Sequence, residues 1–285
     1  MFYKNGNTAV ILCSDGTKIR YIPDDELPQP VRPESIDIKI TNYCRNNCWF
    51  CYEHSNPNGQ HGNLNHPILE TLEAGTELAI GGGNPLAHPQ LESFLSRMRS
   101  KKVVCNLTIH QKDYVKNKQY IDEIVLHRFV NGLGISVGDI DDNLQIHDDI
   151  RKRVVVHTII GITPVSVIQK ISQRYKVLLL GNKNQQPDIA IINEIRNYIT
   201  NCGDMVEALY FDNLACEQLD VRSLIDDNTW KSRYMGDDGM FTMFIDLIQE
   251  CGYVSSVDKD IGVSLSESST IRDVFSKIRQ SINRV

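Results

Sequence analysis

Residues 41–54, TNYCRNNCWFCYEH, place Cys44, Cys48, Cys51 and His54 within eleven positions. Thiolates are soft ligands that suit iron–sulfur clusters, zinc or Cu(I). A [4Fe–4S] cluster normally takes four cysteines, so three on one short loop would leave one iron open to another ligand. With His54 as a fourth ligand, the stretch would instead form a closed Cys3His zinc site. The third alternative is that the cysteines bind no metal and only pack against neighbouring side chains.

The composition is that of an ordinary globular protein. The chain has 285 residues, 41% of them hydrophobic and 23% charged, enough for one large α/β domain or two small ones. The net charge is −6, so the chain has no overall positive charge to attract nucleic acid or an anionic membrane, and neither is expected as a partner. The N-terminus does not resemble a signal peptide, and the apolar runs are too short to span a bilayer. We therefore expect a cytoplasmic protein whose cysteines are thiols or metal ligands.

From residue 35 onward, short apolar segments alternate with amphipathic ones. This alternation predicts parallel strands joined by right-handed helical crossovers. The predicted strands are residues 35–41, 77–82, 103–109, 132–137, 153–162 and 176–181, with 208–214 as a candidate seventh. The predicted helices are residues 91–101, 113–127, 141–152, 164–174 and 188–202. The predicted fold class is α/β, a partial (β/α)6 TIM-like barrel, with a doubly wound sheet as the alternative.

The two ends of the chain depart from the alternation. TAVILC and TKIRYI flank the turn SDG, which predicts a small N-terminal β-hairpin, and a proline-rich linker follows. Residues 240–256 predict a strand pair and residues 273–284 a closing helix. We divide the chain into three predicted parts: the N-terminal β-hairpin and linker, the barrel, and a C-terminal cap or extension, at residues 1–34, 35–215 and 216–285.

Two features follow the first two predicted barrel strands directly. The three cysteines follow the first strand, and GGGNPLAHP, residues 81–89, follows the second. Ligands of such folds bind at the carboxyl ends of the strands, where both features would lie. Glycine lets the backbone approach a ligand closely, and Pro85 fixes the direction in which the chain leaves.

The pattern C-x3-C-x-aromatic-C after the first strand resembles the signature of the radical SAM superfamily, with Phe50 at the aromatic position. The resemblance implies an oxygen-sensitive [4Fe–4S] cluster on Cys44, Cys48 and Cys51, whose fourth iron binds the amino and carboxylate groups of S-adenosylmethionine (SAM). It also implies reductive cleavage of SAM to a 5′-deoxyadenosyl radical that abstracts hydrogen from a substrate. The electron would come from an external flavodoxin- or ferredoxin-like donor.

Residues 81–89 resemble the family's glycine-rich GGEP motif, whose backbone receives the amino group of SAM. The resemblance nominates Gly81, Gly82, Gly83 and Asn84 as cofactor-binding residues. Asn84 stands where the family usually has Glu. Because an amide offers no charge to an ammonium, we expect SAM binding to depend on other groups as well.

Resemblances at later strand ends nominate further SAM contacts. Ser136, on the fourth strand, would contact the ribose, and His157, on the fifth, would face SAM. Asn182, after the sixth, would face the adenine or ribose together with Gly181. His110, at the end of the third strand, is a weaker candidate. From the residues alone, a serine bonded to nearby backbone and a satisfied core histidine remain alternatives for Ser136 and His157.

The C-terminal strand pair resembles the start of a SPASM- or twitch-type extension that is poor in cysteine. The dense cysteine runs of such extensions are absent, so we interpret the other cysteines as small buried hydrophobes: Cys13, Cys105, Cys202, Cys216 and Cys251. Peptide-modifying members continue in this region, which favours a peptide or a small metabolite as the substrate. The alternatives are an activase that forms a glycyl radical on a partner enzyme, and a non-catalytic cluster- or zinc-binding module.

Overall fold

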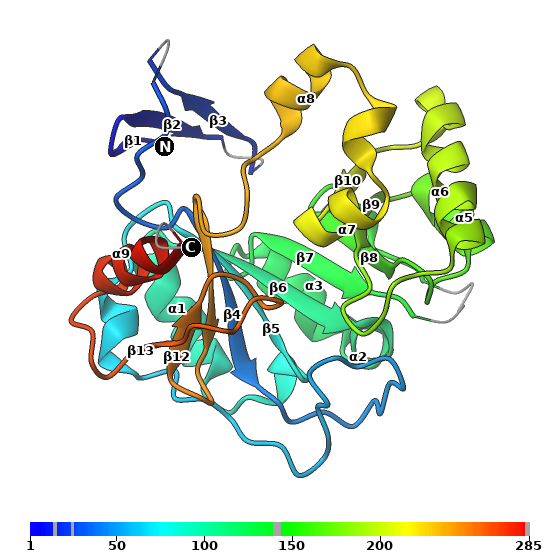
Figure 1. The fold of residues 1–285 in the computed structure, drawn as a ribbon. Helices are drawn as coiled ribbons and strands as arrows, with labels where there is room; N and C mark the ends of the chain where they lie inside the picture. Colours follow the sequence, from blue (N-terminus) through cyan, green and yellow to red (C-terminus); the bar gives the residue numbers. More distant parts are fainter. Residues whose placement is uncertain (14–15, 24–25, 139–143, 283–285) are drawn as a thin grey trace.

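The computed structural model describes residues 1–13, 16–23, 26–138 and 144–282, and one large sheet organises them (Figure 1). Its ten strands lie in the order β10-β9-β8-β7-β6-β5-β4-β11-β12-β13. From β4 to β10 the spatial order follows the chain without reversal, and each neighbouring pair is parallel. Right-handed crossovers then all fall on one face, which is the arrangement of a partial barrel and not of a doubly wound sheet.

The predicted α/β fold is confirmed, with small changes at the strand ends. The strands are β4 (Ser35–Thr41), β5 (Glu77–Gly82), β6 (Val104–His110), β7 (Gly132–Ser136), β8 (Val154–Ile159), β9 (Lys176–Leu180), β10 (Leu209–Phe211), β11 (Thr242–Asp246), β12 (Cys251–Tyr253) and β13 (Val263–Ser264). The predicted strand 153–162 already ends at Ile159, because the chain turns at Gly161, which has a φ of 76°.

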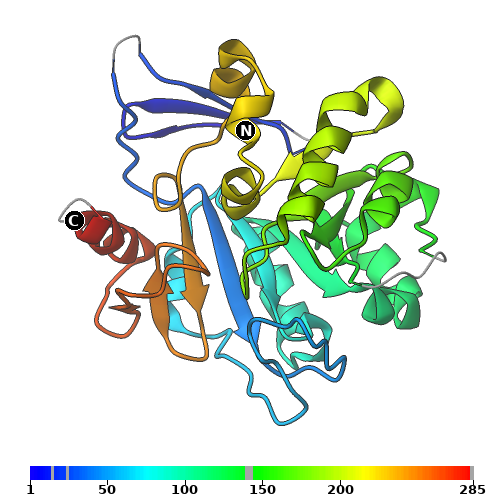
Figure 2. The ribbon, with the colours of Figure 1, turned by 45° about the vertical axis from the view of Figure 1, so that its right-hand side comes forward.

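Helices alternate with the strands, and Figures 1 and 2 show α5 and α6 outside the strands β8 to β10. The α-helices are α1 (Leu91–Ser100), α2 (Gln111–Lys116), α3 (Lys118–Leu126), α4 (Asp148–Arg151), α5 (Val165–Ser172), α6 (Ile189–Asn201), α7 (Asn213–Gln218), α8 (Asp227–Arg233) and α9 (Ile271–Ile282). Short 3-10 turns are η1 (Pro67–Thr71), η2 (Pro85–Ala87), η3 (Gly203–Met205) and η4 (Val221–Leu224).

Two predicted helices differ from the structure. The helix predicted at 113–127 is divided into α2 and α3 because Asn117, with φ −118° and ψ 24°, leaves the helical conformation. Of the helix predicted at 141–152, only Asp148–Arg151 is helical, and residues 141–143 lie outside the described residues. Ser14 and Asp15 of the predicted hairpin turn, and residues 283–284 of the predicted closing helix, also lie outside them.

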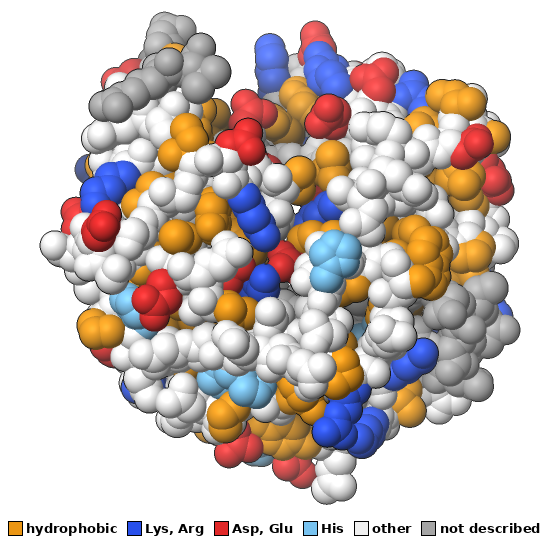
Figure 3. All heavy atoms as spheres, turned by 60° about the horizontal axis from the view of Figure 1, so that its bottom comes forward, with side chains coloured by type: hydrophobic (Ala, Val, Ile, Leu, Met, Phe, Trp, Pro, Cys, Tyr) orange, Lys and Arg blue, Asp and Glu red, His pale blue; other side chains and the backbone are white. Residues whose placement is uncertain are grey.

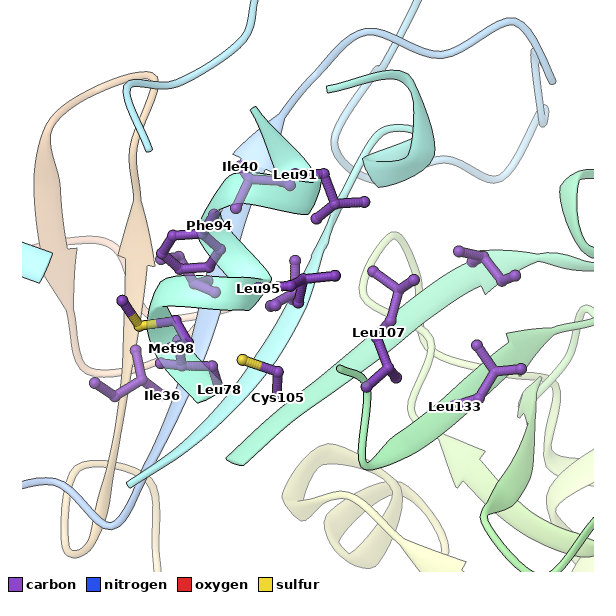
Figure 4. Close-up of a cluster of buried hydrophobic side chains, with 14 of the residues drawn as sticks. Ile36, Ile40, Leu78, Leu91, Phe94, Leu95, Met98, Cys105, Leu107 and Leu133 are labelled. Carbon is purple, nitrogen blue, oxygen red and sulfur yellow. The ribbon is translucent and has the colours of Figure 1, made fainter. Parts of the chain in front are cut away.

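The apolar face of α1 forms the core with the first barrel strands (Figure 4). Phe94, Leu95 and Met98 point from the helix towards the sheet and are at most 1% exposed. Alternation along β4 places Ile36, Ile38 and Ile40 in this core. The residues between them, starting with Asp37, therefore face the concave side of the sheet.

The N-terminal segment is a three-stranded antiparallel sheet instead of a two-stranded hairpin: β1 (Phe2–Asn5), β2 (Thr8–Leu12) and β3 (Lys18–Tyr21). The missed strand β1 joins β2 through a two-residue turn in which Gly6 has a φ of 62°. Two residues of the Gly-Asn type between two strands are a hairpin signal, and the pair Gly6-Asn7 is the one that predicts β1.

This small sheet lies against the amino-terminal ends of the first two barrel strands. Arg20 bonds the buried carboxylate of Glu34, just before β4, at 2.8 Å. Lys18 bonds Glu77, the first residue of β5, at 2.8 Å. The N-terminal sheet therefore lies beside the starts of β4 and β5, away from the three cysteines.

The C-terminal segment extends the same sheet on its other side. β11 pairs in parallel with β4, and β12 and β13 follow antiparallel to it. The closing helix α9 packs on β12, β13 and η1, as Figures 1 and 2 show for the two strands. Its buried side chains are Ile271, Val274, Phe275 and Ile278.

A buried ion-pair network joins β4, β11 and the loop after β4 that carries Cys44, Cys48 and Cys51, which is called the cysteine loop below. Lys39 on β4 contacts the Glu53 carboxylate, and its Nζ lies 3.0 Å from Oδ2 of Asp246 on β11. Lys259 reaches Glu53 from the C-terminal segment at 3.2 Å. The Glu53 side chain is only 8% exposed, and that of Asp246 is fully buried. Hydrogen bonds from Lys39 and Lys259 lower the pKa of Glu53 despite its burial.

Replacing Asp246 with alanine should lower the free energy of unfolding by about 3–5 kcal/mol, because Lys39 then loses one of its two buried counter-charges. Chemical denaturation of the metal-free protein measures the change. The matched control is Glu207→Ala, which removes a half-exposed ion pair with Arg151 and should cost no more than about 1 kcal/mol. Equal losses in the two variants would show that the buried network does not join β11 to the barrel as described.

Candidate cofactor site

The loop that carries the three cysteines leaves β4 at its carboxyl end and crosses towards the ends of later strands. Cys44, Cys48 and Cys51 are each partly exposed. The Phe50 ring packs on Gly138, two residues after β7, so closely that a Cβ there would lie 2.5 Å from Cζ. The Phe50 carbonyl accepts a hydrogen bond of 2.8 Å from Asn184, beyond β9. Phe50 thus fixes the loop across the carboxyl edge of the sheet.

The geometry around the cysteines does not form a closed site for a single ion. Among the described residues, no three His, Cys, Asp or Glu side chains lie close enough to hold one metal ion. His54, the proposed fourth zinc ligand, is exposed and adopts a left-handed φ of 48°.

The three glycines at residues 81–83, called the glycine run here, pack against the backbone that leads into the cysteine loop. Gly83 and Asn84 donate backbone hydrogen bonds of 2.7 Å to the carbonyls of Thr41 and Tyr43. A Cβ on Gly82, which has a φ of 113°, would lie 2.2 Å from the Thr41 oxygen, and one on Gly83 would lie 2.3 Å from the Tyr43 oxygen. A Cβ on Gly81 would meet nothing within 4 Å. Gly82 and Gly83 are therefore required by the fold itself, whereas Gly81 leaves open space above the sheet.

Asn84 binds a carboxylate that sequence reasoning did not single out. Its Nδ2 donates to Asp113 Oδ1 at 2.9 Å, while its Oδ1 accepts from the Leu86 amide at 3.1 Å. The other carboxylate oxygen of Asp113 accepts from the side chain of Asn46, between the first two cysteines. Burial raises the pKa of the Cys44 thiol, and the Asp113 charge contributes in the same direction.

Three of the nominated residues form one row across neighbouring strands. His110 lies opposite Ser136, and Ser136 opposite His157, in the registers of β6, β7 and β8. The His157 ring lies over Gly134, whose Cβ would come within 2.4 Å of it, and burial lowers the pKa of His157 to about 4. His110 Nδ1 accepts a hydrogen bond from the Lys112 amide and so caps α2.

Asn182, after β9, has a firmly held backbone and one unpaired side-chain atom. The backbone N–H of Asn182 donates to Gln218 Oε1 at 2.8 Å, and its backbone carbonyl accepts from Gln218 Nε2 at 2.9 Å. Its Oδ1 accepts from the Asn184 amide at 3.1 Å. Asn182 is 4% exposed, yet its Nδ2 is buried without a hydrogen-bond partner in the described part of the chain. A buried donor without a partner is uncommon in a folded protein.

Charged side chains face the same concave side. Burial raises the pKa of Asp37 to about 6, and the positive charge of Lys183 opposes that shift. Lys183 Nζ lies 4.1 Å from the centre of the Tyr52 ring and 2.6 Å from Ser256 Oγ. Figure 3 shows a hollow near the middle of the carboxyl-end face, with basic and acidic side chains around it. Alternation along SIDIKIT is the signal that places Asp37 and Lys39 on this face.

The structure thus brings all the nominated residues to one edge of one sheet. The cysteine loop, the glycine run and Asn84 follow β4 and β5. Ser136, His157 and Asn182 lie at or near the ends of β7, β8 and β9.

Residues 38–161 match the family model of the radical SAM superfamily. The match begins within β4 and includes the cysteine loop, the glycine run and the strands β5 to β8. Residues 38–161 therefore form a radical SAM domain. Proteins of this superfamily use a [4Fe–4S] cluster and SAM.

Solved structures of SuiB from Streptococcus suis share the fold. The crystal structure bound to the precursor peptide SuiA aligns with a TM-score of 0.60 and 12% identity over 87% of this chain. The structure bound to SAM aligns with a TM-score of 0.58 and 13% identity over 88% of this chain. The chain spans 64% of the first SuiB chain and 68% of the second. No curated protein sequence matches this chain.

The residues present fit the two cofactors of the family. Three partly exposed thiols on one loop are suitable ligands for an iron–sulfur cluster. Gly81 leaves open space at the carboxyl end of β5, and a buried Nδ2 without a hydrogen-bond partner in the described part of the chain lies after β9. Among the described residues, no helix is sufficiently long and apolar to pass through a membrane.

Replacing Gly82 with alanine should destabilise the metal-free protein by about 1–3 kcal/mol, because a Cβ at this positive φ would strike the Thr41 carbonyl. Gly81→Ala is the matched control one residue away. It adds a Cβ in open space and should change stability by less than about 1 kcal/mol. Thermal or urea unfolding of both variants distinguishes them. A Gly82→Ala protein as stable as Gly81→Ala would contradict the close packing of the glycine run on the cysteine loop.

Proposed function

We propose that this chain is a radical SAM enzyme that cleaves SAM reductively at a [4Fe–4S] cluster and abstracts hydrogen from a peptide. The observation that carries the proposal is the placement of Cys44, Cys48 and Cys51 on one braced loop at the carboxyl edge of a partial barrel. That loop supplies three ligands, whereas a [4Fe–4S] cluster has four irons.

When bound, the cluster and SAM would supply an electron to the sulfonium and a 5′-deoxyadenosyl radical that removes a hydrogen atom from the substrate. The chain's own residues would bind and orient SAM. Gly81 leaves room for the methionine part, and Asn182 Nδ2 donates a hydrogen bond to the nucleoside. His157, whose pKa is lowered to about 4, stays neutral at physiological pH and beside Ser136 offers uncharged hydrogen-bonding groups.

The ends of the barrel would protect the reaction. The N-terminal sheet covers the amino end through the ion pairs of Lys18 and Arg20. At the other end, Lys259 and Ser256 of the C-terminal segment contact Glu53 and Lys183. Such closure keeps water from a reactive intermediate. The division into parts at residues 1–34, 35–215 and 216–285 belongs to this proposal.

A peptide substrate is supported by two observations. The structure of SuiB that shares this fold was solved with a precursor peptide bound. The concave face of this chain also presents Asp37 and Lys183, polar groups suited to the backbone and side chains of a peptide. A hollow with basic and acidic side chains around it lies near the middle of the carboxyl-end face (Figure 3).

The electron would come from a flavodoxin- or ferredoxin-like protein. Trp49, next to Cys48 on the cysteine loop, is 78% exposed and gives the donor an apolar contact beside the cluster. We place the protein in the cytoplasm, where thiols stay reduced and such donors operate.

Replacing Cys44, Cys48 or Cys51 with alanine should abolish the cluster and SAM cleavage together. After anaerobic reconstitution, the parent protein should hold about four iron and four sulfide ions and release 5′-deoxyadenosine when reduced. Each variant should hold less than half as much iron and release no 5′-deoxyadenosine. Cys13→Ala, far away in the N-terminal sheet, is the control and should behave as the parent. A single variant that cleaves SAM at the parental rate would remove that cysteine from the ligand set.

The peptide assignment predicts deuterium transfer from a peptide to 5′-deoxyadenosine. Cells of the source organism grown in D2O provide an extract that is separated into peptides and non-peptide metabolites. The reduced enzyme should release deuterated 5′-deoxyadenosine with the peptide fraction, and prior digestion of that fraction by a protease should remove the signal. Deuterium transfer only from the non-peptide fraction would contradict the peptide assignment and leave the radical SAM reaction intact.

A further inference from the structure

Asp37 is a charged side chain on the concave side of the sheet, in the middle of β4. The strands β5 and β11 pair with β4 on either side, so Asp37 stands opposite Ala79 and Phe244 in the interior of the sheet. Its side chain is surrounded by protein and yet accessible to solvent. A carboxylate in such surroundings is normally paired with a positive charge.

The concave side around Asp37 is not filled by other side chains. In β5, β6, β8 and β9, the residues that face the helices are buried, whereas the alternating residues on the concave side are partly exposed. The neighbours on β5 are small, since Ala79 lies opposite Asp37 and Gly81 leaves open space. A ligand on the concave side can therefore reach the Asp37 carboxylate.

Asp37 has no partner within the described part of the chain. There, its carboxylate accepts no hydrogen bond, and no Lys, Arg or His side chain lies within 4.0 Å of it. The positive charge that acts on it is that of Lys183. The Lys183 ammonium is held elsewhere, 2.6 Å from Ser256 Oγ and 4.1 Å from the centre of the Tyr52 ring. Lys183 therefore leaves Asp37 free to pair with a ligand.

The charges that act on Asp37 are mostly negative. Asp212 and Asp238 both raise its pKa, and Lys183 alone opposes them. Asp212 accepts hydrogen bonds from two backbone amides, which hold its carboxylate in place and leave its charge. With a pKa of about 6, Asp37 is itself mostly ionised at neutral pH. Three carboxylates and one ammonium give a negative potential that favours a cationic ligand.

The depth of Asp37 in the sheet selects a long cationic group. Asp37 precedes Thr41, where the cysteine loop begins, by four positions, which is roughly 13 Å along the strand. A peptide bound beside the cysteine loop therefore needs a long side chain to reach it. Among peptide side chains, those of lysine and arginine combine a positive charge with the greatest length.

We propose that Asp37 binds a cationic side chain, lysine or arginine, of the peptide substrate. The inference rests on the proposed function and adds to it the class of peptide. An ammonium or guanidinium bonded to a carboxylate forms one of the stronger hydrogen bonds available in a binding site. This contact would orient the peptide with the cationic residue directed into the barrel, so Asp37 is a specificity-determining residue.

The alternative is that Asp37 only supports the fold, through its attraction to Lys183. A structural role lowers the reaction of every peptide by the same factor. A direct contact matters only while the peptide carries its charge. Neutralising the peptide and neutralising Asp37 should therefore have non-additive effects if the two groups touch.

The experiment uses the peptide fraction of cells grown in D2O and measures deuterium transfer to 5′-deoxyadenosine. One sample is untreated, one is acetylated to neutralise amines, and one is treated with phenylglyoxal to neutralise guanidinium groups. A fourth is treated with methyl acetimidate, which modifies amines and keeps their charge. The parent should transfer at least about tenfold less deuterium after acetylation or after phenylglyoxal, and the effective reagent identifies lysine or arginine. Acetimidate should change transfer by less than about threefold.

The variant Asp37→Asn completes the comparison. It should transfer at least about tenfold less deuterium from the untreated peptides, and the effective reagent should lower this further by less than about twofold. Asp37→Glu keeps the charge and should stay within about threefold of the parent. The control is Glu123→Gln, on the exposed side of α3, which should behave as the parent. Thermal unfolding and iron content show whether each protein is folded and loaded.

The outcomes are distinct. A parent that neither acetylation nor phenylglyoxal affects would overturn the inference, as would an Asp37→Asn variant that transfers deuterium as the parent does. Losses of the same factor in the parent and in Asp37→Asn when the peptides are neutralised would overturn the contact in favour of a structural role. Absence of transfer from untreated peptides to the parent would overturn the proposed peptide substrate itself, and this inference with it.

Discussion

The candidate site depends on the close backbone contact between the ends of β4 and β5. Gly83 and Asn84 donate 2.7 Å hydrogen bonds to the carbonyls of Thr41 and Tyr43, immediately before Cys44. Only glycine permits this approach, because a Cβ on Gly82 or Gly83 would overlap those carbonyl oxygens. The contact sets the start of the cysteine loop and the direction in which Asn84 points. The loop that carries the three thiols therefore starts from a fixed position.

The rest of the chain holds this edge in place. Phe50 carries the cysteine loop across to β7 and β9, and the Lys39–Glu53–Asp246 network anchors its far end to β11. The N-terminal sheet occupies the opposite end of the barrel. Access to the concave face is therefore left at the carboxyl end, where the hollow in Figure 3 lies.

Much of this architecture could be predicted from the sequence because it depends on local pattern. Apolar strands such as SIDIKIT alternate with amphipathic helices, and parallel strands bring their carboxyl ends together whatever the details of the loops. The cysteine loop, the glycine run, Ser136 and His157 were therefore expected at one edge. The division of the helix at Asn117 was missed because a single residue outside the helical conformation leaves the apolar period unchanged. β1 was missed although Gly6-Asn7 signals its turn.

Asp113 was missed for a different reason. Its significance depends on side-chain hydrogen bonds with Asn46 and Asn84, which are 67 and 29 positions away in the chain. No periodicity or spacing encodes such a contact, and Asp113 alone looks like an ordinary first-turn helix residue. The ion pairs of Lys39 with Glu53 and Asp246 were hidden in the same way. Contacts between distant segments can be found only once the register of the strands is known.

The measurement that tests the account most directly is 57Fe Mössbauer spectroscopy of the reconstituted protein with and without SAM. Three protein thiolates on the loop after β4 leave one iron of a [4Fe–4S] cluster without a protein ligand. We predict that SAM changes the isomer shift and quadrupole splitting of about one quarter of the iron and leaves the remainder unaltered. A spectrum that SAM does not change, from a protein that holds a full cluster, would contradict the central claim.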